Sequence, residues 1–186
     1  MRKKAFILTF GLLLIVGFTL LTKAVTAQQT VSITEARELY YGMSVDECNA
    51  LELADLFSKK EPSDPLLKAY YGAASAAAPT CVTNPARKIS YFRKGTRLLD
   101  DAVKAAPGNF EIRFLRFATQ EMAPGFLGYK DDLENDKNFL IKNLASGFNK
   151  INDQKVLNFV SNFLLGSKNL NQKEKLTVKE FLKTLK

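Results

Sequence analysis

Helix-start signals recur along this chain at short intervals, and they constrain its fold more than any other feature. Asp64-Pro65 and Asn84-Pro85 each place a capping side chain directly before a proline, an arrangement favoured at helix N-termini. Further capping residues stand at Ser32, Ser44, Asn109, Asn171 and Thr177. All of these except Asn109 are followed three residues later by a glutamate, as in a capping box. Strand-like alternation of apolar and polar residues is absent, so an all-α fold is expected.

The spacing of apolar side chains between these signals predicts about eight helices. Their expected ranges are 33–42, 45–58, 65–78, 85–105, 110–121, 131–145, 153–166 and 173–185. Part of a tetratricopeptide pattern occurs at Gly95, Leu99, Ala102 and Pro107. The segments before and after it lack the standard spacing. We therefore expect antiparallel helix pairs arranged either as a tetratricopeptide-like array or as an irregular helical bundle.

The segment 110–121 is apolar over most of its circumference. One side of this helix carries Phe110, Phe114 and Phe117. Another side carries Ile112, Leu115 and Met122. Such a helix packs on two sides and is central. Arg113 and Arg116 lie on the remaining polar strip, where they would be partly enclosed and need partners. They either join an internal ion-pair network, with candidate partners Asp100, Asp131 and Asp132, or form a site for an anion or carboxylate.

The segment 123–129 alternates glycine and proline with three large side chains, Phe126, Leu127 and Tyr129. Glycine permits tight turns and close backbone approach, whereas the large side chains must either enter the core or stand exposed. The segment is either an interhelical turn anchored by its aromatic rings or a lip that binds a ligand or partner beside Arg113 and Arg116.

Residues 1–27 have the pattern of a secretory signal peptide. Arg2, Lys3 and Lys4 precede the apolar run Ala5–Leu21, and a small-residue cleavage site ends at Ala27. We expect cleavage there, with an uncleaved membrane anchor as the alternative, and a single α-helical domain over 28–186. Cleavage removes four basic residues and lowers the net charge from +8 to +4, which is too small to favour nucleic acid as a partner.

The absence of histidine excludes histidine-activated nucleophiles and the commonest zinc ligand. The acidic residues between 131 and 136 lack the spacing of a calcium loop and suit a helix N-terminus. We therefore expect no catalytic residue, metal or cofactor. The two cysteines, Cys48 and Cys81, either form one disulfide in an oxidising compartment or remain two buried thiols.

The middle of the chain carries a linear series of short motifs between Tyr70 and Asn143. They are Tyr71-Gly72-Ala73-Ala74, Asn84-Pro85, the stretch from Lys88 to Gly95, that from Glu111 to Phe117, that from Pro124 to Tyr129, and Asp136-Lys137. This series resembles an uncharacterised family of small exported proteins from Bacteroidota. The resemblance implies a distantly tetratricopeptide-like, all-helical exported domain, and it implies no activity and no catalytic residue.

Together these features favour an exported, noncatalytic interaction module that binds a protein or peptide partner in the periplasm or cell envelope. Its expected contact surface comprises Arg113, Arg116, Phe126, Leu127 and Tyr129. The alternative is a binder of a small apolar or carboxylated ligand, which a deep pocket lined by Phe114, Phe117 and Phe126 would favour. A hydrolase that uses paired carboxylates is a third class.

Overall fold

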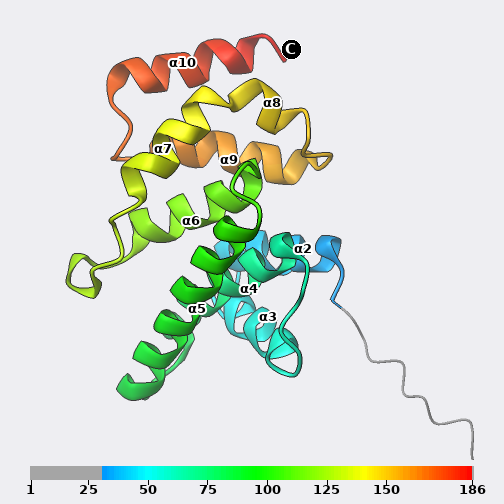
Figure 1. Cartoon of the computed structure of the whole chain (residues 1–186), viewed down its shortest axis with the longest axis vertical. Coiled ribbons are helices and arrows are strands. Elements are labelled where there is room, and N and C mark those ends of the chain that lie inside the picture. Colours follow the sequence, from blue (N-terminus) through cyan, green and yellow to red (C-terminus); the bar gives the residue numbers. More distant parts are fainter. Residues whose placement is uncertain (1–30, 186) are drawn as a thin grey trace, which may run out of the picture. The chain divides into compact units, whose positions relative to one another are not determined.

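The computed structural model of the protein describes residues 31–185, which form one compact unit. Regular structure in this range is entirely helical, so the predicted all-α class is confirmed (Figure 1). The α-helices are α2 (Ile33–Tyr41), α3 (Asn49–Ser58), α4 (Pro65–Ala77), α5 (Pro85–Ala105), α6 (Phe110–Met122), α7 (Leu133–Lys142), α8 (Leu144–Phe148), α9 (Gln154–Gly166) and α10 (Gln172–Lys183). Three short 3-10 helices join them: η1 (Gly42–Ser44), η2 (Ala78–Cys81) and η3 (Gly125–Leu127).

The predicted signal segment, 1–27, lies outside the described residues. Between residues 31 and 185, none of the helices combines the length and apolar character needed to cross a membrane.

Most of the predicted helix starts are confirmed by side-chain caps. Five capping side chains accept a hydrogen bond from the backbone N–H three residues later: Ser32, Asp64, Asn84, Asn109 and Asn171. Asn171 and Glu174 complete a capping box, so Thr177 lies inside α10 and starts no helix of its own. These local hydrogen bonds satisfy free backbone donors whatever the helix packs against, which is why the sequence revealed them.

Two predicted helices were wrong in their bounds. The range 45–58 starts too early, because Asp46 accepts a hydrogen bond from the Cys48 backbone N–H and holds the chain in a turn before α3. The range 131–145 is interrupted at Asn143, which separates α7 from α8. The Asn143 side chain donates to the Phe139 carbonyl at 2.8 Å, and this local hydrogen bond competes with helix continuation.

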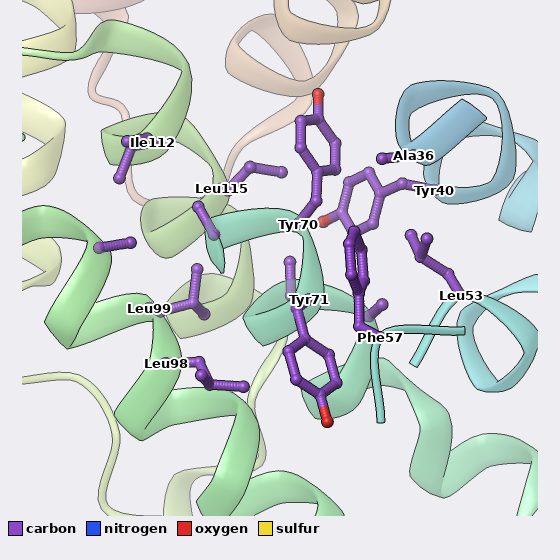
Figure 2. Close-up of a cluster of buried hydrophobic side chains, with 14 of the residues drawn as sticks. Ala36, Tyr40, Leu53, Phe57, Tyr70, Tyr71, Leu98, Leu99, Ile112 and Leu115 are labelled. Carbon is purple, nitrogen blue, oxygen red and sulfur yellow. The ribbon is translucent and has the colours of Figure 1, made fainter. Parts of the chain in front are cut away.

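Helix α6 lies between two hydrophobic clusters, as its two apolar sides predict. Ile112 and Leu115 pack with buried residues of α2–α5, and Figure 2 shows them in the same cluster as Tyr70 and Leu99. The phenylalanines of α6 pack instead with α7–α10. Met122 departs from the prediction, because it ends α6 beyond both clusters and is 75% exposed.

Helices α4 and α5 meet at two glycines. A Cβ atom built on Gly95 would lie 2.4 Å from the Ala76 backbone nitrogen and 2.5 Å from the Gly72 carbonyl oxygen. Only a residue without a side chain permits this approach. The close contact fixes the position of α4 relative to the middle of α5.

The structure joins Cys48 to Cys81 in a disulfide, with a Cα–Cα distance of 5.5 Å. On an ideal continuous helix, Cys81 would lie too far along the axis to meet Cys48. Helix α4 instead ends at Ala77, and η2, which contains Pro79, turns the chain toward α3. The disulfide thus fixes η2 against the start of α3.

Candidate functional site

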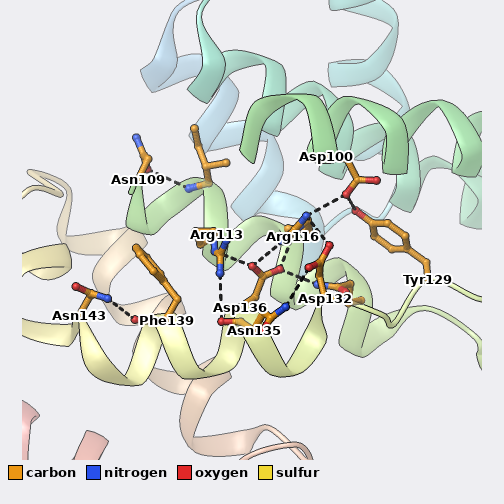
Figure 3. A network of polar contacts seen from close by, with 12 residues as sticks. Asp100, Asn109, Arg113, Arg116, Tyr129, Asp132, Asn135, Asp136, Phe139 and Asn143 are labelled. Carbon is orange, nitrogen blue, oxygen red and sulfur yellow. Dashed lines mark hydrogen bonds and ion pairs between the residues drawn. The ribbon is translucent and has the colours of Figure 1, made fainter. Parts of the chain in front are cut away.

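Arg116, one of the predicted contact residues, points into an internal ion-pair network (Figure 3). Its Nε donates to Asp136 Oδ2 at 2.7 Å and its Nη2 to Asp136 Oδ1 at 3.0 Å. Its Nη1 lies 3.2 Å from Asp100 Oδ1 and 3.0 Å from Asp132 Oδ2. Three carboxylates surround one guanidinium, and each of its three nitrogens already contacts a carboxylate.

Arg113 shares the same central carboxylate. Its Nε lies 2.7 Å from Asp136 Oδ1, and its Nη2 donates to the Asn135 carbonyl at 3.1 Å. Its guanidinium carbon lies 4.8 Å from the centre of the Phe139 ring, a cation–π arrangement. The side chain bridges α6 and α7 and leaves 14% of its surface exposed.

Asp136 is the residue of this network that sequence reasoning missed. It is fully buried, and Gln120 also donates to it at 2.7 Å. Of the three predicted partners, Asp100 and Asp132 pair with Arg116, whereas Asp131 pairs with neither arginine. Asp136 follows α6 by one loop and a helical turn, so only tertiary packing brings it beneath the arginines.

The electrostatics of the network favour a structural role. Burial raises the pKa of Asp136, against the opposing effect of Arg116 and Arg113. Burial by itself would lower the pKa of Arg116, but the attraction of the Asp136 carboxylate is stronger and raises the pKa above its usual value. An added anion would have to displace carboxylates that are already bound to the arginines, so the network is a poor anion site.

Part of the segment 123–129 is an anchored interhelical turn, and part of it is exposed as a binding lip would be. Tyr129 anchors it, because its hydroxyl donates to Asp100 at 2.9 Å and its ring meets Phe92 edge to face. Burial and the adjacent carboxylate of Asp100 raise the pKa of Tyr129, so the phenol stays neutral. Gly128 takes a φ of 66°, which turns the chain after η3. Phe126 remains 88% exposed.

An apolar groove of about 760 Å³ lies beside this segment. We call it the apolar groove; its lining includes Ala76 and Ala77 of α4, Phe92 of α5, Met122 of α6, Phe126 and Phe163. Leu127 and Phe126 are the two predicted site residues that reach it, whereas Arg113, Arg116 and Tyr129 do not line it. Phe114 and Phe117, which the sequence also suggested for a pocket, are fully buried in the core around α6.

The groove exists because α4 presents small side chains where its neighbours present large ones. Ala73, Ala76 and Ala77 line it from α4, and their methyl groups cannot fill the space that Phe92 and Phe163 leave. The alanine-rich stretch 73–78 was a visible signal, but alone it predicts only a good helix. Its size places the groove within the range of small-molecule sites.

The comparisons with known proteins leave this site without a precedent: no family model, curated protein or solved structure matches the chain. The resemblance to exported Bacteroidota proteins therefore stays a prediction. Within residues 31–185, no three acidic or cysteine side chains are grouped so as to hold a metal ion.

Proposed function

We propose that this protein is an exported, noncatalytic binding protein that holds a small apolar ligand in the apolar groove. The observation that carries the proposal is the groove itself, whose volume is about 760 Å³. Its lining is almost wholly apolar, and Lys88 is the single charged residue among the described residues that form it. Burying ligand methylene groups against such a surface is the main source of affinity that the site offers. Export to the periplasm or cell envelope rests on the sequence of residues 1–27.

The range of burial among the lining residues supports a preformed site. Ala73 and Tyr40 are buried at 2% and 7% exposure, whereas Met122 and Phe126 are 75% and 88% exposed. The lining therefore combines core residues with residues open to solvent, which we call the rim. An apolar molecule entering at the rim would cover large side chains that are otherwise in contact with water.

Chain-length dependence of binding tests this proposal. Isothermal titration with octanol, decanol and dodecanol should show affinity rising roughly tenfold for each pair of added methylene groups, because each buried methylene contributes about 0.8 kcal/mol. Affinity should rise across all three alcohols, because the groove is large enough to hold each of them. No binding of any of the three alcohols would refute the proposal.

Two matched variants locate the binding. Ala77→Phe places a ring in the groove and should abolish alcohol binding. Ala105→Phe makes the same change at an exposed position of α5 outside the groove, and it should bind as the wild type does. Circular dichroism would show that both variants fold. Equal binding by the two variants would place the alcohols elsewhere.

A protein or peptide partner is the second candidate, and the exposure of the rim favours it. Phe126 and Met122 both line the groove and are both exposed, so an apolar side chain of a partner could contact them on entering it. Crosslinking in envelope fractions with wild type and Phe126→Ser tests this candidate, because an exposed side chain can be changed without disturbing the core. A partner captured equally by both forms would contradict a role for the rim.

A further inference from the structure

Charge is distributed unevenly around the apolar groove. Lys88 is exposed, and no acidic residue in the described part of the chain joins it in the lining. The lysines that form ion pairs within residues 31–185 are Lys68, Lys137 and Lys183. Lys88 is not one of them, so its ammonium group is available to a ligand.

The position of Lys88 in the fold adds to this positive character. Pro85 begins α5 and also lines the groove, so the N-terminus of α5 lies at the same place as Lys88. The first turn of α5 contains no acidic residue. The helix macrodipole and Lys88 therefore act with the same sign on any group bound there.

The remaining lining favours a hydrocarbon chain. Met43 from η1 and Phe159 and Phe163 from α9 add sulfur and aromatic surface without charge. A methylene group is about as large as a water molecule, which occupies about 30 Å³, so 760 Å³ corresponds to roughly 25 such groups. That space suits one acyl chain with its head group.

We infer that the ligand of the apolar groove is a single-chain amphiphile whose anionic head group pairs with Lys88 at the start of α5. This inference rests on the proposed function and adds the chemistry of the ligand to it. The hydrocarbon chain supplies the affinity, and Lys88 selects the charge of the head. An exposed ion pair contributes little, so the selection is modest in size.

The experiment compares three amphiphiles of equal chain length below their micelle concentrations: dodecanoate, dodecanol and dodecyltrimethylammonium. Wild type should bind dodecanoate about fivefold more tightly than dodecanol, and the cationic amphiphile less tightly than either. Dodecyl phosphate, measured alongside, distinguishes a phosphate head from a carboxylate by the tighter of the two dissociation constants. The dodecanoate preference should shrink as salt is added.

Three variants separate the inference from the proposed function. Lys88→Gln should remove the preference for dodecanoate while dodecanol binds as before, and Lys88→Glu should reverse the preference toward the cationic amphiphile. Lys104→Gln removes the same charge from an exposed position of the same helix and should change nothing. If dodecanol binds but the dodecanoate preference is absent or survives in Lys88→Gln, the inference is wrong and the proposed function stands. If none of the amphiphiles binds, both are wrong.

Discussion

The Gly95→Ala substitution would test the close contact between α4 and α5. The added methyl group would lie 2.4 Å from the Ala76 backbone nitrogen and 2.5 Å from the Gly72 carbonyl oxygen. Ordinary contacts of a Cβ atom begin near 3.4 Å, so the two helices would have to separate by roughly 1 Å. Both obstructing atoms belong to the backbone of α4 and cannot rotate away as a side chain could.

The expected loss of stability follows from two opposing effects. Overpacking a well-packed contact costs about 1–3 kcal/mol, and the rigid backbone on the other side places this site at the upper end. Alanine is favoured over glycine within a helix by about 1 kcal/mol, which offsets part of the cost. We therefore expect Gly95→Ala to lower the free energy of unfolding by about 2 kcal/mol.

Urea unfolding followed by far-ultraviolet circular dichroism measures this loss as a shift in midpoint at unchanged slope. Gly166→Ala is the matched control, because a Cβ atom there meets nothing within 4 Å and α9 should be unchanged or slightly stabilised. If Gly95→Ala proves as stable as Gly166→Ala, the contact between α4 and α5 is looser than described. Separation of the helices should also weaken dodecanol binding, since both helices line the apolar groove.

Three further outcomes are expected from the same unfolding assay. Replacing Cys48 and Cys81 by serine should lower the free energy of unfolding by about 3–4 kcal/mol, because the disulfide closes a loop with a separation of 33 residues. Reduction of the wild-type disulfide should lower it by a similar amount. A loss below about 1 kcal/mol would contradict the loop-closure argument. Asp136→Asn should cost about 3 kcal/mol by removing the central carboxylate from Arg116, and unchanged stability would show that Asp100 and Asp132 compensate for it. Stability should fall steeply as the pH rises above 10, by up to roughly 5 kcal/mol per pH unit, because burial raises the pKa of four tyrosines and the folded state then binds more protons than the unfolded state. The four are Tyr40, Tyr41, Tyr70 and Tyr129. The chain has six tyrosines, and the full tyrosinate absorbance of all six appearing well before unfolding would contradict this last prediction.

The sequence predicted local features well. Caps such as Asp64 and Asn84 act through hydrogen bonds within three residues, so their outcome does not depend on distant parts of the chain. The two-sided character of α6 was also readable, because its apolar residues follow the helical period. The break at Asn143 was missed, because an asparagine that competes with helix continuation looks in sequence like any exposed helical residue.

The candidate site was predicted only in part. Phe126 and Leu127 reach the apolar groove, but Arg113 and Arg116 turn toward Asp136 instead. A charged residue on a helix faces either solvent or a neighbouring carboxylate, and its own sequence neighbourhood does not decide between these. The choice depends on which other segment of the chain packs against α6.

The sequence by itself determined the helical class, the caps that start most helices and the central place of α6, because each follows from interactions between residues close along the chain. Tertiary structure alone decided the disulfide, the burial of Asp136 beneath two arginines, and the apolar groove. A groove is the space that remains when distant helices pack, and small side chains such as Ala76 and Ala77 create it only where Phe92 and Phe163 fail to fill it.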